Sequence, residues 1–387
     1  MSSRQQDRKD FDVQRAAYLC AERELTQAEI GRMLGGLSQS RVSRLLKRAE
    51  ERGWLERSYR FVPAKLEAGR YEQLRQFEEP STLVDLLAKI RPRTGVHVSG
   101  VHVLDTGSSG LSERTITVRL ARFGRAAVVP LDGLLGRSTC VAVSWGRSVS
   151  CAVDSLRAAP TLHSSGRAIR VVPLCGEPTE QQSNRDTSSH LAERLHEALH
   201  SSAPKPPSLT GVPALIPRHF KGADARGIRK FVALTASYRD VFGAADPLID
   251  RVDTLLTSVG PAKRPMGFIH EELLKAGGLK GKALKSGDLE DLVAGDIGGV
   301  LLPRQGLSAK GLREVEALNT MWTGATLAQY ERIALGAAKT SRPGIVVLSI
   351  GDEGRAEVIA EAIRHGLVGV LVIDRSLADG LTKVLAA

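Results

Sequence analysis

The chain has 387 residues, with 54 lysines and arginines against 43 aspartates and glutamates, which gives a formal net charge of +11 at pH 7. This length suits two or three domains, and the positive excess suits association with a polyanion such as DNA. No apolar run reaches the roughly 20 residues of a membrane span, and the N-terminus lacks the apolar core of a signal peptide. The four cysteines show no disulfide or metal-binding spacing. We therefore expect a cytoplasmic protein with reduced cysteines and no membrane association.

The first 60 residues show the pattern of a winged helix-turn-helix domain. Residues 1–12 are expected to be frayed, and 13–21 are predicted to form the first helix. Thr26 is a candidate N-cap of the second helix, because a glutamate three residues later completes a capping box. Gly35 and Gly36 permit the sharp turn that must follow that helix. A short hairpin, the wing, is predicted for residues 54–62.

The helix that begins after Ser38 is the predicted recognition helix. Its apolar residues recur at the spacing that buries one side, which leaves a polar and basic side exposed. Glutamine can pair with adenine and arginine with guanine in the major groove, whereas flanking arginines such as Arg52 are expected at phosphates. A charge run alone usually marks a solvated helix face, but the order of cap, turn, basic helix and wing favours DNA binding. The candidate DNA-binding residues are Thr26, Gln27, Ser38, Gln39, Ser40, Arg41, Ser43, Arg44, Lys47 and Arg48.

The rest of the chain is predicted to hold a connector over residues 61–94 and an effector-binding and oligomerisation domain over 95–387. The connector is expected to contain an extended piece and then a helix. From Gly95 onward, strands, small-residue loops and helices alternate, which is typical of an α/β domain with a doubly wound, mainly parallel sheet. Strands are predicted at 96–104, 141–145, 169–174, 252–259, 297–302, 345–350 and 367–373, and helices around 119–135 (with Pro130 as an interruption), 149–156, 191–199 and 356–363.

Four glycine-containing loops follow predicted strands, where open parallel sheets bind ligands. Arg147 and Arg355 can each make a two-pronged hydrogen bond to a phosphate or carboxylate, and aspartates there can accept hydrogen bonds from hydroxyls. A glycine after a strand is usually only turn chemistry, so each loop taken singly is a weak signal. Together they predict a site for a phosphorylated sugar. The candidate residues are Gly146, Arg147, Ser148, Gly176, Glu177, Asp253, Gly260, Asp296, Gly351 and Arg355, with Asp352 in the same loop as the last two.

Enzymatic functions were weighed as alternatives. His196-Glu-Ala-Leu-His200 fits the H-E-x-x-H pattern of zinc proteases, but it ends its helix and has no third ligand at a supporting spacing, so no metal is expected. No Walker A loop or G-x-G-x-x-G fingerprint occurs, and no nucleotide cofactor is expected. A sugar-phosphate isomerase or deaminase with a DNA-binding head remains the rival, with Asp253, Asp296 or Glu177 as its base.

Several motifs together resemble the SorC family of bacterial sugar-binding transcriptional regulators. They are Val42-Ser-Arg-Leu-Leu-Lys-Arg-Ala49, Val143-Ser-Trp-Gly-Arg-Ser148, Gly295-Asp-Ile297 and Gly351-Asp-Glu-Gly-Arg355. The resemblance implies a domain like sugar-phosphate isomerases and glucosamine-phosphate deaminases, a phosphorylated sugar or related metabolite as effector, operator DNA as partner, and a homodimer or homotetramer.

The resemblance also implies roles for residues in the predicted ligand loops. Gly146, Arg147 and Ser148 would form the effector-phosphate loop, Gly260 would end another strand at the site, and Arg355 would contact the ligand. The family usually has threonine in place of Ser148, Gly-Ile-Gly in place of residues 258–260 and lysine in place of Arg355. Residues 218–251 also match it poorly.

Overall fold

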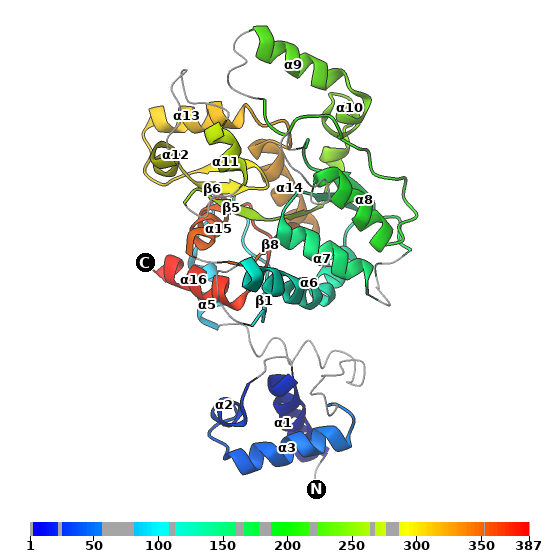
Figure 1. The fold of residues 1–387 in the computed structure, drawn as a ribbon, viewed down its shortest axis with the longest axis vertical. Helices are drawn as coiled ribbons and strands as arrows, with labels where there is room; N and C mark the ends of the chain where they lie inside the picture. The colour runs from blue at the N-terminus through cyan, green and yellow to red at the C-terminus, as the bar shows by residue number, and fades with distance from the viewer. Residues whose placement is uncertain are drawn as a thin grey trace. The chain divides into compact units, whose positions relative to one another are not determined.

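The computed structural model of the protein divides into two compact units, residues 1–80 and 81–387, which we describe separately (Figure 1). The predicted wing beyond Leu55, the first part of the predicted connector and Asp352 lie outside the described residues. The structure describes residues 3–21, 25–55, 81–107, 113–159, 164, 166–177, 187–216, 223–263, 268–275, 286–351 and 353–386.

The N-terminal unit is a helix-turn-helix built from α1 (Ser3–Ala21), α2 (Gln27–Met33) and α3 (Gln39–Glu51). The predicted capping box is present, because the Thr26 hydroxyl accepts from the Glu29 N–H and the Glu29 carboxylate accepts from the Thr26 N–H. The turn after α2 uses two left-handed glycines, at positions 35 and 36, as predicted. Helix α1 begins ten residues earlier than expected, so the prediction of a frayed segment was wrong for residues 3–12. The helices enclose a small core of Val13, Ala16, Ala17, Leu19, Ile30, Val42, Leu46, Ala49 and Leu55.

The second unit is organised around a six-stranded sheet in which every neighbouring pair is parallel, in the order β1-β9-β8-β4-β2-β3. This confirms the predicted mainly parallel sheet, including the parallel pairing of β8 with β9 across the C-terminal βαβ unit. Apolar residues fill the strands because both faces are covered. The strands are β1 (Gly100–Leu104), β2 (Cys140–Val143), β3 (Arg170–Pro173), β4 (Thr254–Thr257), β8 (Gly344–Ser349) and β9 (Val370–Asp374).

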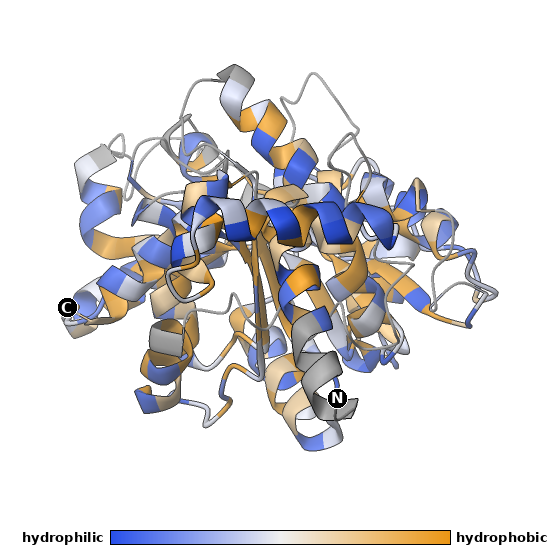
Figure 2. Cartoon of the chain, turned by 90° about the horizontal axis from the view of Figure 1, so that it is seen from below, coloured by the Kyte–Doolittle hydropathy of each residue, from blue (hydrophilic) through white to orange (hydrophobic). Residues whose placement is uncertain are grey.

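Helices cover both faces of this sheet, which confirms the doubly wound architecture. Alternate strand residues face two separate cores, and Figure 2 shows the strands in orange between helices striped orange and blue. Pro130 lies inside α6 without ending it, contrary to the predicted interruption. One core is covered by α6 (Glu113–Leu135), α7 (Arg147–Arg157) and α8 (Ser188–Ala198). The other is covered by α5 (Ser81–Lys89), α14 (Leu327–Thr340), α15 (Glu353–His365) and α16 (Arg375–Ala386).

A second, antiparallel sheet has the order β5-β6-β7 and packs against α15. Two predictions were wrong here. The expected strand 252–259 ends at Thr257, and Val259 starts the small sheet. The expected strand 297–302 is interrupted, because β6 ends at Ile297 and the chain turns at Gly298 and Gly299 before β7. The strands are β5 (Val259–Pro261), β6 (Val293–Ile297) and β7 (Val300–Pro303). The remaining helices are α9 (Ala223–Leu234), α10 (Ala236–Phe242), η3 (Leu248–Arg251), α11 (Phe268–Lys275), α12 (Ser286–Leu292) and α13 (Ala309–Asn319).

The segment immediately before β1 belongs to the core of the second unit. Helix α5 packs on α16, and Leu83 and Leu87 are buried in the same cluster as the sheet. The Arg93 N–H donates to the Arg364 carbonyl at the end of α15. Residues 81–94 are therefore anchored in the α/β unit, although they fall within the range predicted as connector. Among the described residues, no helix is both long enough and apolar enough to cross a membrane.

Candidate nucleic-acid interface and ligand site

Helix α3 presents one apolar and one basic side. Val42, Leu46 and Ala49 are buried against α1 and α2, as their spacing predicted. The opposite side is exposed along the helix, and the Arg44 guanidinium lies along it, donating from Nε to the Ser40 carbonyl at 3.3 Å. All the candidate side chains on α3 are exposed, namely Gln39, Ser40, Arg41, Ser43, Arg44, Lys47 and Arg48. This side of α3 can therefore meet an acidic surface.

Residues around the helix-turn-helix have structural roles that compete with DNA contact. The Thr26 hydroxyl is held in the capping box of α2, and Gln27 is only half exposed. Ser38 is the N-cap residue of α3, but its side chain makes no capping hydrogen bond, and its hydroxyl lies 3.1 Å from that of Ser40. Arg52 forms a 2.7 Å salt bridge with Asp10 of α1 and lies over the Trp54 ring. Arg52 thus ties α3 to its own domain, which disfavours the expected phosphate contact.

The topology of the large sheet defines a ligand crevice. After β2 the chain forms β3 on one side of that strand and then β4 on its other side. In open α/β sheets such a switch of direction leaves a crevice beyond the carboxyl ends of the two strands, where ligands bind. The loops after β2 and β4 meet there, because a Cβ placed on Gly146 would lie 2.9 Å from the Ser258 hydroxyl oxygen. Of the predicted residues, Gly146, Arg147, Ser148 and Gly260 therefore lie at this crevice.

The start of helix α7 is suited to an anion. Gly146 is its N-cap and has a φ of 135°, a conformation that few residues other than glycine adopt. Gly146 makes no side-chain capping hydrogen bond, and the helix dipole favours negative charge at this end. Arg147 is exposed and Ser148 is buried at this end. A phosphate loop at this position stays a prediction, and the start of α7 has the geometry to accept an anion.

The β6–β7 hairpin approaches the same crevice. A Cβ on Gly298 would lie 2.5 Å from both the Thr257 hydroxyl and the Tyr330 hydroxyl, so only glycine permits this contact. Tyr330 donates to the Gly298 carbonyl at 3.2 Å, and the Ser144 hydroxyl donates to Thr257 at 2.9 Å. The sequence did not mark Thr257, Gly298 or Tyr330 as candidate site residues. The Gly298-Gly299 pair between apolar residues was the available signal, because it is a hairpin turn signature.

Asp296 is a buried carboxylate beside a basic residue. One oxygen accepts from the Gly299 N–H at 2.9 Å, and the other lies 3.6 Å from Nδ1 of the buried His270. Burial raises the pKa of Asp296 from 3.8 to about 7, while the Gly299 hydrogen bond and Arg355 act in the opposite direction. Arg355 also donates to the Val259 carbonyl at 3.1 Å. The structure thus brings Asp296, Arg355 and β5 together, as the sequence predicted, and adds His270, whose pKa burial lowers to about 4.

Three other predicted site residues have roles within the fold. A Cβ on Gly176 would lie 2.4 Å from the Val212 carbonyl oxygen, so this glycine allows two segments to approach. The Glu177 carboxylate, beyond β3, accepts from the Thr187 and Thr210 hydroxyls at 3.3 and 3.4 Å. The Gly351 N–H donates to Asp374 at 3.2 Å beyond β8. Gly351 and Glu177 still lie at the carboxyl ends of strands, whereas Gly176 has a sufficient structural explanation.

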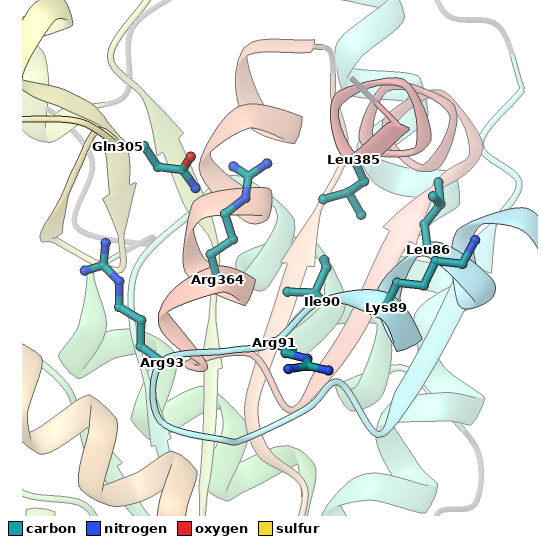
Figure 3. Close-up of a pocket in the computed structure, with 8 residues that line it drawn as sticks. All are labelled: Leu86, Lys89, Ile90, Arg91, Arg93, Gln305, Arg364 and Leu385. Atoms are coloured by element: carbon teal, nitrogen blue, oxygen red, sulfur yellow. The ribbon is translucent and has the colours of Figure 1, made fainter.

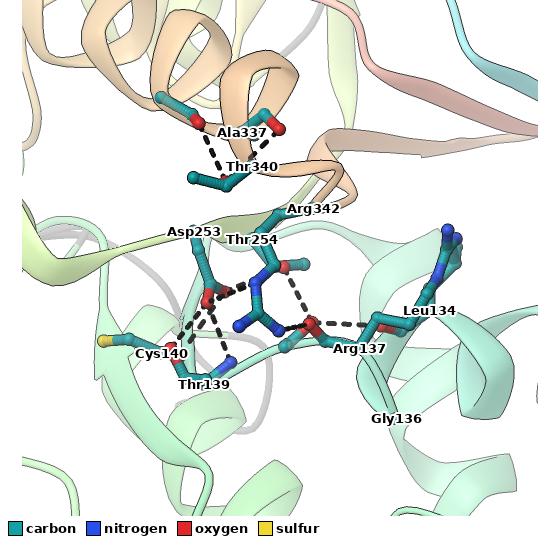
Figure 4. Close-up of polar contacts among 12 residues, drawn as sticks. Leu134, Gly136, Arg137, Thr139, Cys140, Asp253, Thr254, Ala337, Thr340 and Arg342 are labelled. Atoms are coloured by element: carbon teal, nitrogen blue, oxygen red, sulfur yellow. Dashed lines mark hydrogen bonds and ion pairs between the residues drawn. The ribbon is translucent and has the colours of Figure 1, made fainter.

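Asp253 lies at the opposite edge of the sheet from the crevice. It immediately precedes β4, and in a parallel sheet the amino ends of the strands form one common edge. Its carboxylate accepts from the Thr139 N–H and hydroxyl at 2.9 and 2.6 Å and lies 3.9 Å from Arg342 (Figure 4). The expectation that Asp253 contacts the effector is therefore corrected: this residue joins strand ends, and we leave it out of the proposed site.

The histidines of the H-E-x-x-H pattern lie at the end of α8 and just beyond it. His196 lies in the last turn of α8, and His200 follows that helix with a φ of 44°. Within the described parts of the chain, no group of three histidine, cysteine, aspartate or glutamate side chains could hold a metal ion. All four cysteines are free thiols. Burial raises the pKa of both Cys140 and Cys175 to about 12, so neither thiol is activated.

Comparisons with known proteins bear on the helix-turn-helix and on the fold. The MarR family model matches residues 15–60, which contain the helix-turn-helix. The sorbitol operon regulator of Klebsiella pneumoniae is 26% identical over 173 residues, which is 45% of this chain and 46% of that protein. The chain thus matches about half the length of this curated relative.

Solved structures share the fold. The full-length sorbitol operon regulator SorC from Klebsiella pneumoniae superimposes with a TM-score of 0.50 at 20% identity, covering 96% of this chain and 98% of that one. A DeoR family transcriptional regulator from Listeria monocytogenes gives a TM-score of 0.51 at 18% identity, covering 77% and 99%. The sequence match, the shared fold and the MarR-type helix-turn-helix together support the predicted assignment of this chain to the SorC family of sugar-binding transcriptional regulators.

Proposed function

We propose that the protein is a DNA-binding transcriptional regulator whose affinity for its operator is controlled by a phosphorylated sugar or a related metabolite. The observation that carries this proposal is the pairing of two features on one chain. One is the exposed basic side of α3 in a MarR-type helix-turn-helix. The other is a crevice with a helix N-terminus that lacks a side-chain cap, in a domain that shares the fold of SorC.

In the proposed DNA complex, α3 enters the major groove. Gln39 and Arg44 are the candidates for base contacts, because their side chains can pair with adenine and guanine. Arg41 and Arg48 would contact phosphates and supply the salt-dependent part of the affinity. Regulators of this type bind as dimers with half-sites separated by whole helical turns, so we propose a homodimer or homotetramer on a palindromic operator.

In the proposed effector complex, the phosphate lies at the start of α7 near Gly146, Arg147 and Ser148. Arg355 is placed to add a second cation, and Asp296 can exchange hydrogen bonds with sugar hydroxyls, since burial raises its pKa to about 7 and a protonated carboxyl both donates and accepts. Effector binding changes operator affinity only if the effector binds unequally to the two subunit arrangements. The hairpin at Gly298 contacts both Thr257 and Tyr330, and it is the element that we propose to respond.

A sugar-phosphate isomerase or deaminase is the second candidate, and Asp296 is the observation that favours it. A buried carboxyl with a pKa near 7 has the basicity of a general base. Turnover of ribose, gluconate or fructose phosphates by the purified protein, abolished in Asp296→Asn, would establish the enzyme. Altered DNA binding by the same compounds without turnover would establish the regulator.

The DNA-binding half can be tested without knowing the effector. Duplexes selected from random sequence by the full chain should converge on a palindrome, and its affinity should exceed that of scrambled DNA by at least about a thousandfold. A thermal-shift screen of the same protein against sugar phosphates should find compounds that raise its melting temperature, since a ligand of the native state stabilises it by mass action. Binding without sequence preference, together with a steep salt dependence, would indicate a nonspecific DNA-coating protein instead.

A further inference from the structure

A second concave surface lies at the far end of α15 from Arg355. Two cavities of about 500 and 210 Å³ adjoin there and share Gln305 and Arg364 in their linings. Arg364 is nine residues after Arg355 on the same helix, which is roughly 14 Å at 1.5 Å per residue. This surface is therefore separate from the proposed effector crevice.

The larger cavity is basic and holds no acidic lining residue. Figure 3 shows Arg93, Arg364 and Gln305 around one open space, with Arg91 and Lys89 on its far side. Lys89 and Arg364 each lie in the last turn of a helix, where the helix dipole favours a cation. Arg91 and Arg93 lie in the loop beyond α5, and neither forms a salt bridge with any residue that the structure describes. Arg93 still acts on the Glu361 carboxyl, whose pKa it lowers against the larger, opposite effect of burial. Ile90 and Leu385 form an apolar wall.

The smaller cavity contributes an unsatisfied acceptor. Glu361 has a side chain only 4% exposed, and its Oε2 lies 3.4 Å from the Arg364 guanidinium. Its Oε1 accepts no hydrogen bond, and Nε2 of the buried His365, 3.6 Å away, also has no hydrogen-bond partner. Buried carboxylate oxygens are nearly always paired, so this atom has unused capacity for a hydroxyl donor.

We propose that these adjoining cavities form a second ligand site for a small hydroxylated anion. A phosphate or carboxylate binds between Arg93, Arg364 and the Gln305 amide, where two guanidinium groups can each donate a pair of hydrogen bonds. A hydroxyl of the same molecule donates to Oε1 of Glu361, and its carbon chain lies along Ile90 and Leu385. The volume of the larger cavity is within the range of small-molecule sites.

The test is titration calorimetry of the full chain with 6-phosphogluconate, which carries a phosphate, a carboxylate and hydroxyls. The double variant Arg93→Gln/Arg364→Gln should raise the dissociation constant of one class of 6-phosphogluconate sites about tenfold or more. Arg313→Gln, which changes an exposed arginine on α13, should leave that constant unchanged. Glu361→Gln should weaken the binding of 6-phosphogluconate and leave the binding of inorganic phosphate unchanged. Gln305→Ala, at an exposed position, provides a second variant should the double variant fail to fold.

Several results would overturn the proposal. Unchanged 6-phosphogluconate binding in both Arg93→Gln/Arg364→Gln and Gln305→Ala would remove the site. If 6-phosphogluconate binding were lost only in Arg147→Ala, the ligand would bind in the proposed effector crevice alone. That result would support the crevice and reject this second site. A change in sedimentation mass or in DNA affinity, with no effect on 6-phosphogluconate binding, would show that the surface meets another subunit or a duplex, and would also reject it.

Discussion

A buried ion pair fixes the carboxyl end of the central sheet, and replacing its cation tests how the site loops are held. Arg119 of α6 and Asp374 at the end of β9 are 2% and 0% exposed, and Nη2 lies 2.5 Å from Oδ2. Asp374 also accepts from the Thr106 hydroxyl at 3.0 Å and from the backbone N–H groups of Gly351 and Leu377 at 3.2 and 3.1 Å. The pair therefore joins α6 to the loop after β8 and to the start of α16.

Arg119→Met keeps much of the side-chain volume but leaves the Asp374 carboxylate buried without a countercharge. Removing one partner of a buried pair costs roughly 3–5 kcal/mol, because the remaining charge stays desolvated. For a domain of this size each kilocalorie corresponds to about 2 °C in melting temperature. We therefore expect the melting temperature of the α/β unit to fall by roughly 6–10 °C and the thermal unfolding of the N-terminal unit to be unaffected.

The loss is measured by urea denaturation and scanning calorimetry of the wild type and the variant. Arg332→Met is the matched control, since Arg332 and Asp250 form a pair that is 50% and 45% exposed, and exposed pairs contribute at most about 1 kcal/mol. If Arg119→Met were no more destabilising than Arg332→Met, the ion pair would not be a structural anchor and the reasoning would be refuted.

Three further predictions concern the two sites. The folded state raises the pKa of Asp296 from 3.8 to about 7 and therefore favours the protonated carboxyl. The free energy of unfolding of the wild type, relative to that of Asp296→Asn, should consequently fall as the pH rises from about 4 to about 7. Parallel curves of stability against pH for the two proteins would contradict this. Gly299→Ala should lower the urea midpoint, since its φ is 100° and a Cβ would lie 2.1 Å from the Trp322 ring, whereas Gly336→Ala, in the exposed part of α14, should raise it slightly; equal effects would refute the argument. Arg44→Ala should weaken operator binding by roughly 1–3 kcal/mol in fluorescence anisotropy, and an equal loss on scrambled DNA would show a phosphate contact instead.

Much of the fold could be predicted because the strands of a doubly wound sheet are apolar on both faces. The run from Ile345 to Ile350, the helix with Ile359 and Ile363 on one side, and the next apolar run predicted the β8–α15–β9 unit. The apolar stretch at 252–259 did not reveal that one strand ends at Thr257 and another begins at Val259. Both segments are buried, and only the partner strands distinguish them.

The exposed basic side of α3 was predictable, since helical periodicity alone separates its buried side from its exposed side. Glycine-containing loops after β2 and β4 were also recognisable. Asp253 was misplaced because a residue near a strand can belong to either edge of the sheet until the exact strand start is known. His270 and Tyr330 carried no local signal, since each is a single residue on a helix whose packing depends on distant segments.

Coupling between effector binding and operator binding is measured as the affinity of the full chain for its selected operator, with and without the sugar phosphate found by thermal shift. We predict that the compound changes this affinity severalfold to about a hundredfold, the range of a coupling free energy of 1–3 kcal/mol. Arg147→Ala and Arg355→Ala should retain operator binding and lose the response. Operator binding that is indifferent to every compound bound by the α/β unit would contradict the central claim.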